Sequence, residues 1–158
     1  FSAGARLGYV HALPEVLHKM YNAKTATNSQ TNTTLQLICA EFFRRGYFAE
    51  HLEKTRALYR SRRDVMMESI DRFFPEGTKH TYPQGGLFTW VELPEGIDTT
   101  ELLKKANANK LAFVAGEAFF TEGGGKGKNC MRLSFGNVSP EKIEIGMKRL
   151  GDLIKSKM

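Results

Sequence analysis

Two arginines of this 158-residue chain stand in settings that suit the binding of an anion. Arg6 lies between Gly4 and Gly8 in the segment Gly-Ala-Arg-Leu-Gly-Tyr. Glycine lets backbone approach a ligand closely, and a guanidinium grips phosphate through paired N–H donors, so this segment is typical of a phosphate anchor. Arg132 lies in the segment Met-Arg-Leu-Ser-Phe-Gly. Two such arginines would suit a cofactor phosphate and a substrate carboxylate.

Arg132 needs an anionic partner, because an unpaired charge among apolar residues is costly. Its sequence neighbours, Met131 and Leu133, are both apolar. One candidate partner is a structural carboxylate of the chain itself, such as Glu92. The other is the carboxylate of a substrate, which is the interpretation that we favour.

The composition is that of a globular domain, with 41% hydrophobic and 25% charged residues. No segment approaches the roughly 20 apolar residues of a membrane span, and no signal-peptide pattern is present. Cys39 and Cys130 are too few for a disulfide framework and lack the spacing of metal ligands. We therefore expect buried thiols, no metal, no membrane partner and a cytoplasmic location.

The formal net charge of +6 could attract nucleic acid or an acidic ligand. The arginines of residues 50–68 are interleaved with glutamate and aspartate, however, which is typical of a solvated helix face. The aromatic strand signature of RNA-recognition domains is also absent. We expect no nucleic-acid partner, and salt-sensitive binding of single-stranded RNA is the observation that would revive this alternative.

Hydrophobic periodicity predicts helices and strands in alternation. The helices are expected over residues 15–23, 35–45, 48–74 and 99–109 and from residue 140 onward, and the strands over residues 7–12, 87–93, 111–115 and 130–135. Residues 24–34 are polar and typical of a linker, and residues 116–129 predict a glycine-rich loop. The fold class is therefore α/β, with a mainly antiparallel sheet of three or four strands packed against long helices.

Several apolar positions are expected in the core rather than in a binding site. They are Phe42, Phe43, Phe48, Leu52, Tyr59, Met66, Met67, Ile70, Phe73, Phe74, Ile143, Met147, Leu150 and Ile154. His80 lies near the proposed site segments, and we interpret it as a partly exposed strand residue. The four histidines have no mutual spacing that suits a metal.

Four segments in this order resemble a known family. They are Gly-Ala-Arg-Leu-Gly-Tyr at 4–9, Pro-Gln-Gly-Gly-Leu-Phe-Thr-Trp at 83–90, Phe-Val-Ala-Gly-Glu-Ala-Phe-Phe at 113–120 and Met-Arg-Leu-Ser-Phe at 131–135. Over essentially its whole length the chain resembles the C-terminal part of fold-type I, pyridoxal-phosphate-dependent class I/II aminotransferases. It looks most similar to the branch of α-aminoadipate, kynurenine and aromatic aminotransferases, which is related to MocR-type regulators.

The resemblance implies roles for four residues. Arg6 is similar to the arginine that holds the phosphate of pyridoxal 5'-phosphate, and Arg132 to the arginine that clamps the substrate α-carboxylate. Gly85 and Gly86 would place backbone near the substrate. The family usually has a proline where this chain has Ala3 and Ala115, which loosens two turns but removes no chemical group.

The resemblance also implies that the catalytic residue is absent from the chain. The lysine that forms the Schiff base lies, in the family, in a Ser-x-x-Lys context shortly before the Gly-x-Arg segment. None of the 13 lysines here stands in such a context. We therefore expect a C-terminal fragment that is inactive alone and does not retain the cofactor. Residues 1–30 would be a remnant of the large cofactor-binding domain with a linker, and residues 31–158 the small domain.

The intact parent is expected to be a homodimeric aminotransferase that moves an α-amino group between an amino acid and a 2-oxo acid. An alternative keeps the fold and changes the function: the aminotransferase-like effector domain of a MocR-type transcription regulator. A winged-helix segment ahead of the domain would favour the regulator.

Overall fold

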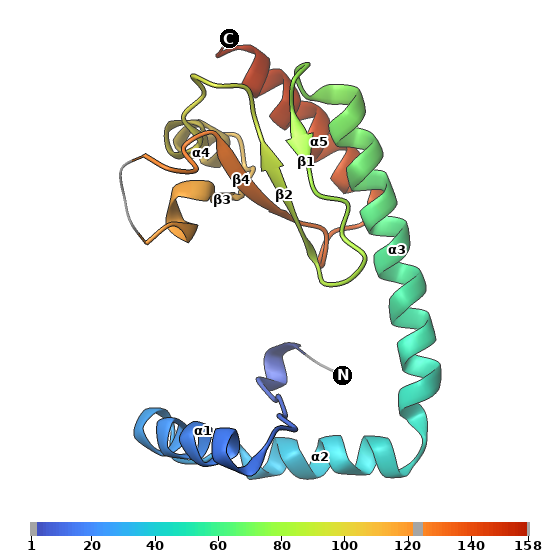
Figure 1. Cartoon of the computed structure of the whole chain (residues 1–158). Coiled ribbons are helices and arrows are strands. Elements are labelled where there is room, and N and C mark those ends of the chain that lie inside the picture. The colour runs from blue at the N-terminus through green and yellow to red at the C-terminus, as the bar shows by residue number, and fades with distance from the viewer. Residues whose placement is uncertain (1–2, 122–124, 158) are drawn as a thin grey trace. The chain divides into compact units, whose positions relative to one another are not determined.

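The computed structural model describes residues 3–121 and 125–157 (Figure 1). The chain divides into two compact units, Phe1–Thr55 and Arg56–Met158. Each unit is described by itself.

The first unit is helical. It contains the short 3-10 helix η1 (Ala3–Ala5), the helices α1 (Pro14–Thr27) and α2 (Thr33–Arg44), and the first part of α3 (Tyr47–Phe73). Pro14 suits the first turn of α1 because its missing N–H would have no partner there. The side chain of Asn32 caps α2 by accepting a hydrogen bond from the N–H of Leu35 at 3.0 Å. Gly46 follows α2 with φ +75°, as expected of a glycine that ends a helix.

The prediction of a strand over residues 7–12 is wrong. Residues 7–12 have no regular structure, and Tyr9 is 94% exposed. A strand needs a hydrogen-bonding neighbour, and the described part of this unit contains no other strand. The predicted linker is also shorter than expected, because α1 continues to Thr27 and α2 begins at Thr33.

No residue of α1 or α2 is buried. The prediction that Phe42 and Phe43 lie in the core is therefore wrong. Phe43 is half exposed and contacts Phe48, with ring centroids 4.6 Å apart. Cys39 is half-buried rather than buried. The apolar stripes of these helices are real but contribute no core within the described residues.

Helix α3 has 27 residues, close to the predicted 48–74. At 1.5 Å per residue its length is about 40 Å. Its buried residues, Met66, Met67, Ser69 and Ile70, all lie near its C-terminal end. The predicted buried stripe is thus correct for this end and wrong for Phe48, Leu52 and Tyr59, which are partly exposed.

The second unit contains a four-stranded antiparallel sheet with the order β1-β2-β4-β3. Its strands are β1 (Lys79–His80), β2 (Phe88–Glu92), β3 (Val114–Ala115) and β4 (Cys130–Ser134). The predicted fold class is confirmed. Strand β3 is shorter than predicted. The bounds of β1 were not predicted, because two residues show no periodicity, although His80 was interpreted as a strand residue.

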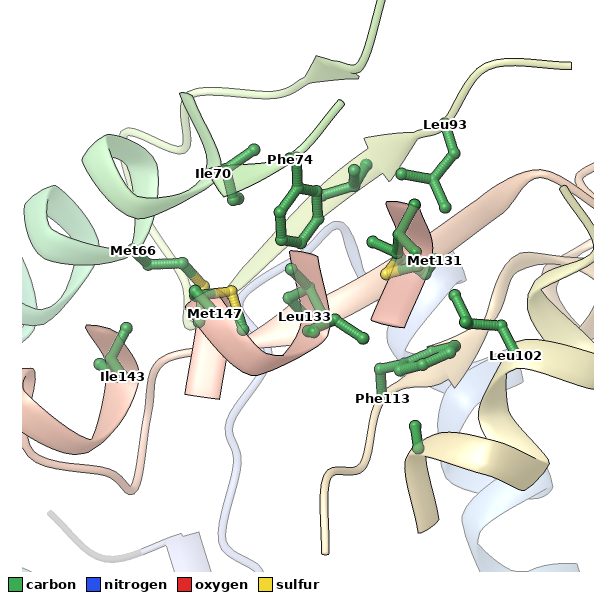
Figure 2. Close-up of a cluster of buried hydrophobic side chains, with 14 of the residues drawn as sticks. Met66, Ile70, Phe74, Leu93, Leu102, Phe113, Met131, Leu133, Ile143 and Met147 are labelled. Atoms are coloured by element: carbon green, nitrogen blue, oxygen red, sulfur yellow. The ribbon is translucent and has the colours of Figure 1, made fainter. Parts of the chain in front are cut away.

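The C-terminal part of α3 covers one face of this sheet together with α4 (Thr99–Ala108) and α5 (Pro140–Lys155). Side chains alternate along a strand, so Val91 of β2 and Met131 and Leu133 of β4 point into this core. Figure 2 shows Met131 and Leu133 beside Met66 and Ile70 of α3, Leu102 of α4, and Ile143 and Met147 of α5. The predicted α5 face of Ile143, Met147, Leu150 and Ile154 is confirmed as buried.

Helices α4 and α5 begin as the sequence predicts. Asp98 caps α4, since its Oδ1 accepts hydrogen bonds from the N–H groups of Thr100 and Glu101 at 2.8 and 3.1 Å. Pro140 stands in the first turn of α5. Gly151, further along α5, lies so close to α3 that a Cβ atom there would come within 2.4 Å of the carbonyl oxygen of Phe73.

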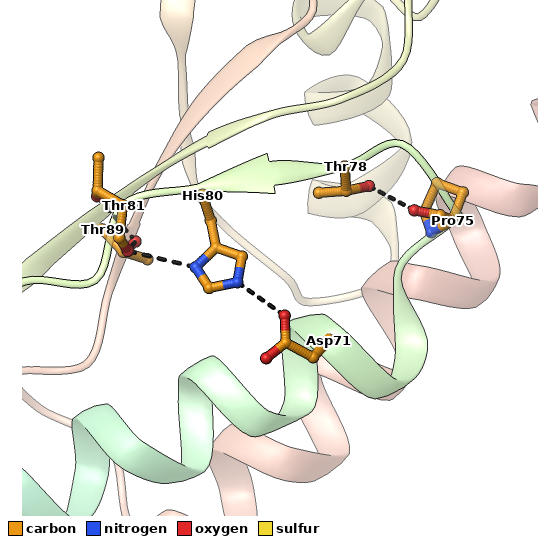
Figure 3. A network of polar contacts seen from close by, with 6 residues as sticks. All are labelled: Asp71, Pro75, Thr78, His80, Thr81 and Thr89. Carbon is orange, nitrogen blue, oxygen red and sulfur yellow. Dashed lines mark hydrogen bonds and ion pairs between the residues drawn. The ribbon is translucent and has the colours of Figure 1, made fainter.

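His80 joins β1 to α3 (Figure 3). Its Nε2 lies 2.8 Å from Oδ1 of Asp71, and its Nδ1 lies 3.3 Å from the carbonyl oxygen of Thr81. The hydroxyl of Thr89 donates to the same carbonyl at 2.7 Å. His80 is partly exposed and lies in a strand, as predicted. Its interactions are structural ones between secondary-structure elements.

Candidate functional site

Arg132 lies in the middle of β4, on the face of the sheet that the helices leave open. Its neighbours Met131 and Leu133 point into the core, so the strand alternation turns Arg132 to the opposite face. It is the direct cross-strand partner of Trp90 on β2 and of Val114 on β3. The face opposite α3, α4 and α5 therefore presents the guanidinium of Arg132 between β2 and β3.

Two aromatic rings contact the guanidinium of Arg132. Its central carbon lies 4.1 Å from the ring centroid of Phe88 and 5.0 Å from that of Phe119. Trp90 packs edge-on against Phe119, with centroids 5.3 Å apart and ring planes at 84°. A guanidinium that lies over aromatic rings makes a cation–π contact there and still has its planar N–H donors for hydrogen bonds. The arrangement suits an anion bound edge-on, as in a bidentate carboxylate pair.

No ion pair neutralises Arg132 among the residues that the structure describes. Glu92, the structural partner considered above, instead lies 3.8 Å from the ammonium nitrogen of Lys79. The alternative of an Arg132–Glu92 pair is therefore not supported. A partly buried guanidinium that has no carboxylate partner among the described residues can receive one from outside the chain.

Glycines fix the segment that carries Phe119. Phe119 is the last residue of the 3-10 helix η2 (Gly116–Phe119), which lies within the predicted glycine-rich loop. Residues 122–124 of this loop lie outside the described residues. A Cβ atom on Gly116 would come within 2.5 Å of the Cβ of Cys130. One on Gly127, which has φ +71°, would come within 2.3 Å of the Phe120 ring. Larger residues at either position would displace the loop.

Gly85 and Gly86 lie in the turn that leads into β2. Both are exposed, and Gly86 has φ +78°, a conformation that favours glycine. A Cβ atom on either would meet no other atom within 4 Å. The next residue, Leu87, accepts a hydrogen bond from the N–H of Phe135 at 3.1 Å, which ties this turn to the end of β4. The two glycines thus lie in a turn that is attached to the sheet of Arg132, and their role stays a prediction.

Arg6 belongs to the first unit and directly follows η1. It is exposed and has φ +53°, which is uncommon for a residue with a Cβ atom. Its assignment to a phosphate is a prediction that rests on the sequence. Arg132, Gly85 and Gly86 belong to the second unit.

Sequence reasoning missed three side chains near the candidate site. Phe119 was not connected with Arg132, although it stands in one of the family-like segments. Arg62 and Arg63 of α3 were interpreted only as part of a solvated face. The structure gives each of them a hydrogen bond to a loop of the sheet. Their positions on a long helix carry no signal of such long-range contacts.

No group of three or more histidine, cysteine, aspartate or glutamate side chains that could hold a metal lies within the described residues. Over residues 3–121 and 125–157, no helix is both long and apolar enough to span a bilayer.

Known proteins resemble the chain along nearly its entire length. An aromatic-amino-acid aminotransferase of Thermococcus litoralis is 43% identical over 155 residues, which are 98% of this chain and 37% of that protein. The crystal structure of an α-aminoadipate aminotransferase of Thermus thermophilus, complexed with N-(5'-phosphopyridoxyl)-L-leucine, superposes with a TM-score of 0.86 at 37% identity. The match covers 97% of this chain and 39% of the Thermus thermophilus enzyme chain.

Regulators are among the more distant relatives. An uncharacterised HTH-type transcriptional regulator of Bacillus subtilis is 27% identical over 154 residues, and the chain covers 31% of its length. The chain therefore spans between about three and four tenths of these relatives. The sequence profile described as aminotransferase class I and II matches residues 2–150. The chain belongs to the class I and II aminotransferase family.

Proposed function

We propose that this chain forms part of a pyridoxal-phosphate-dependent aminotransferase that moves an α-amino group between an amino acid and a 2-oxo acid. The observation that carries the proposal is the guanidinium of Arg132, which two aromatic rings contact and no carboxylate of the described residues neutralises. The aminotransferase relatives at 37–43% identity support the reaction class.

Arg132 would hold the α-carboxylate of the amino acid through two parallel N–H···O bonds. Such a pair fixes the substrate in orientation as well as in position, and orientation is a large part of the rate gain in a bound reaction. Gly85 and Gly86 would let backbone lie close to the substrate. The rings of Phe88 and Phe119 would exclude water from one side of the ion pair and so strengthen it.

Pyridoxal 5'-phosphate is the cofactor that we propose for the whole protein. When bound, it supplies an electron sink for the bond that breaks at the amino-acid Cα. Arg6 would hold its phosphate. Its exposed guanidinium, in a segment with Gly4 and Gly8, matches the donor chemistry that a phosphate dianion requires.

The chemistry also needs a lysine that this chain does not offer in the family-like context. We propose that residues outside the chain supply it, so that the 158 residues alone neither transaminate nor retain the cofactor. In the same proposal residues 1–30 belong to the large domain and a linker, and residues 31–158 form the small domain. The whole protein would be a homodimer, as the resemblance implies, and the two cysteines of this chain, too few for a disulfide framework, fit a cytoplasmic location.

A second candidate is the effector domain of a MocR-type regulator. The relatives named as HTH-type transcriptional regulators, at 27% and 28% identity, favour it specifically. The higher identity of the aminotransferases makes the enzyme the better-supported function. A DNA-binding domain within the whole gene product would reverse this preference.

The test is to express the whole protein that contains these residues and to assay it with a panel of amino acids and 2-oxoglutarate. Appearance of glutamate together with the 2-oxo acid of the donor is expected. Absence of amino-group transfer with every donor from a protein that carries bound pyridoxal phosphate would contradict the enzymatic proposal. Specific DNA binding by that protein would support the regulator.

A further inference from the structure

Two adjacent arginines of α3 hold the two loops that flank the candidate site. Arg63 contacts the loop that precedes β2, and Arg62 contacts the loop that follows β4. Both arginines and both loops belong to the second unit. The site strands β2 and β4 pair directly with each other, so α3 is tied to both at the same end of the sheet.

Arg63 is held on three sides. Its Nε and Nη2 donate to Oδ1 of Asp64 at 2.8 and 2.7 Å, and its guanidinium lies 4.7 Å from the ring centroid of Tyr82. The Tyr82 hydroxyl donates to the same carboxylate oxygen at 3.1 Å. The remaining nitrogen, Nη1, donates to the carbonyl oxygen of Pro83 at 3.3 Å. This carbonyl lies two residues before Gly85, so Arg63 holds the loop of the candidate substrate-binding glycines.

Arg62 is held less completely. Its Nη1 donates to the carbonyl oxygen of Gly136 at 2.6 Å. Its Nε is buried and, among the described residues, has no hydrogen-bond partner. A buried donor without an acceptor opposes folding, so an apolar side chain of similar length would be at least as stable here. The contacts that Arg62 adds are this bond to Gly136 and a cation–π contact with Tyr59, whose ring centroid lies 5.9 Å from the guanidinium carbon.

The two loops are also joined to each other. The N–H of Phe135 donates to the carbonyl of Leu87 at 3.1 Å. A Cβ atom on Gly136 would come within 3.1 Å of the Leu87 side chain, so these residues pack tightly. The contacts form a closed circuit from α3 through Pro83, Leu87 and Gly136 back to α3. Gly85 and Gly86 lie within this circuit, and Arg132 lies on β4, three residues before Phe135.

We propose that Arg62 and Arg63 are positioning residues for the carboxylate site. They fix the Gly85–Gly86 turn and the end of the Arg132 strand relative to α3, and hence relative to each other. The inference rests on the proposed function, in which Arg132 binds a carboxylate. Neither arginine is assigned a contact with substrate.

The test uses the whole protein that contains this chain, freed of cofactor, and the unreactive carboxylate 3-phenylpropionate as the probe. Isothermal titration calorimetry gives the Kd, and thermal unfolding gives the Tm of each variant. The variants are Arg62→Met, Arg62→Lys and Arg63→Gln. Arg72→Gln is the matched control, since Arg72 is exposed on the same helix. Its guanidinium forms an ion pair with Glu144 of α5 at 3.3 Å and not with either loop.

We expect Arg62→Met and Arg63→Gln each to raise the Kd about tenfold, because small misplacements weaken oriented binding strongly. The Arg62→Met protein should keep or raise its Tm, and Arg62→Lys should restore binding to within about twofold, since its ammonium can still reach one carbonyl. A loss of affinity without a loss of stability is the result that a purely structural role would not give.

Binding by Arg62→Met and Arg63→Gln that equals binding by the Arg72→Gln control would overturn the inference. A Kd that rises only in those variants whose Tm falls, and in proportion to that fall, would also overturn the inference. If Arg62→Met does not fold, Arg63→Gln and Arg62→Lys still decide the question. An Arg132→Lys protein that binds the probe as tightly as wild type would instead overturn the proposed function, and the inference with it.

Discussion

The guanidinium carbon of Arg132 lies 4.1 Å from the centroid of the Phe88 ring, although the two residues belong to different strands. Phe88 is paired with Ser134, and Arg132 with Trp90, so the contact runs diagonally across the β2–β4 ladder. Diagonal neighbours in a sheet are within reach of aromatic and long side chains. The register of these two strands therefore determines the orientation of the guanidinium.

Replacing Arg132 by lysine should raise the KM for the amino donor in the whole protein. An ammonium keeps the charge but loses the bidentate fork and the flat face that contacts Phe88 and Phe119. We expect an increase on the order of 10- to 100-fold in steady-state kinetics. The control is Arg149→Lys, since Arg149 is exposed on α5 and donates a hydrogen bond to the carbonyl of Asn109 at 2.7 Å. Equal KM values for the two variants would remove Arg132 from the site.

The contact between Phe88 and Arg132 can be measured by a double-mutant cycle. Phe88→Leu keeps an apolar side chain but removes the ring, and a cation–π contact at a partly exposed site is worth roughly 0.5–2 kcal/mol. We expect a coupling of about this size in kcat/KM between Phe88→Leu and Arg132→Lys. Additive effects of the two substitutions would mean that the ring does not orient the guanidinium.

Replacing Arg6 by alanine should weaken retention of pyridoxal phosphate by the whole protein. The substitution removes a charge-assisted hydrogen-bond donor to the proposed phosphate position. Dialysis followed by measurement of bound cofactor should show a smaller retained fraction than in wild type. Retention equal to that of the parent would make Arg6 a structural residue of the turn after η1.

Two glycines of α5 should respond in opposite directions to the same substitution. Gly146→Ala should stabilise the protein by about 0.5–1 kcal/mol, since alanine is the better helix former and its Cβ would meet only Leu111 at 3.8 Å. Gly151→Ala should destabilise by about 1–3 kcal/mol, since its Cβ would come within 2.4 Å of the carbonyl oxygen of Phe73. Thermal unfolding of both variants checks this. A stable Gly151→Ala protein would show that α3 and α5 pack less closely.

The two cysteines should differ in their reaction with iodoacetamide. Burial raises the pKa of the Cys130 thiol, and the nearby negative charge of Glu92 raises it further. The thiolate is the reactive form, so alkylation of Cys130 should require a pH above the ordinary thiol value of about 8.5. In the 158-residue chain, peptide mass spectrometry at pH 8 should therefore find Cys39 modified first. Modification of Cys130 before Cys39 would show that burial in β4 does not protect the Cys130 thiol from alkylation.

Much of the second unit could be predicted from the sequence, because local signals and packing agree there. The alternation around Val91 and the periodicity of Ile143 and Met147 match the faces that are buried. Asp98 marks the start of α4 through a hydrogen bond that depends on neighbouring residues alone. The bounds of β1 could not be predicted beyond the strand character of His80, because they depend on pairing with β2.

The first unit was predicted less well for a physical reason. Residues 7–12 have strand-like composition, but β structure requires a partner that the sequence cannot supply locally. Phe42 and Phe43 have the spacing of a buried helix face, and spacing does not say what covers it. In the site, the position of Arg132 could be predicted, whereas its contact with Phe119 depends on how Gly116 and Gly127 pack the loop.

The absence of any buried residue in α1 and α2 has a consequence for how this polypeptide behaves by itself. Isolated helices of 12 to 14 residues are marginal in water, since most helix stability in proteins comes from tertiary packing. Amide protons of α1 and α2 should accordingly exchange with deuterium far sooner than those of β2 and β4. A peptide of residues 1–55 should sample its helices only transiently, and its circular dichroism should strengthen when trifluoroethanol is added.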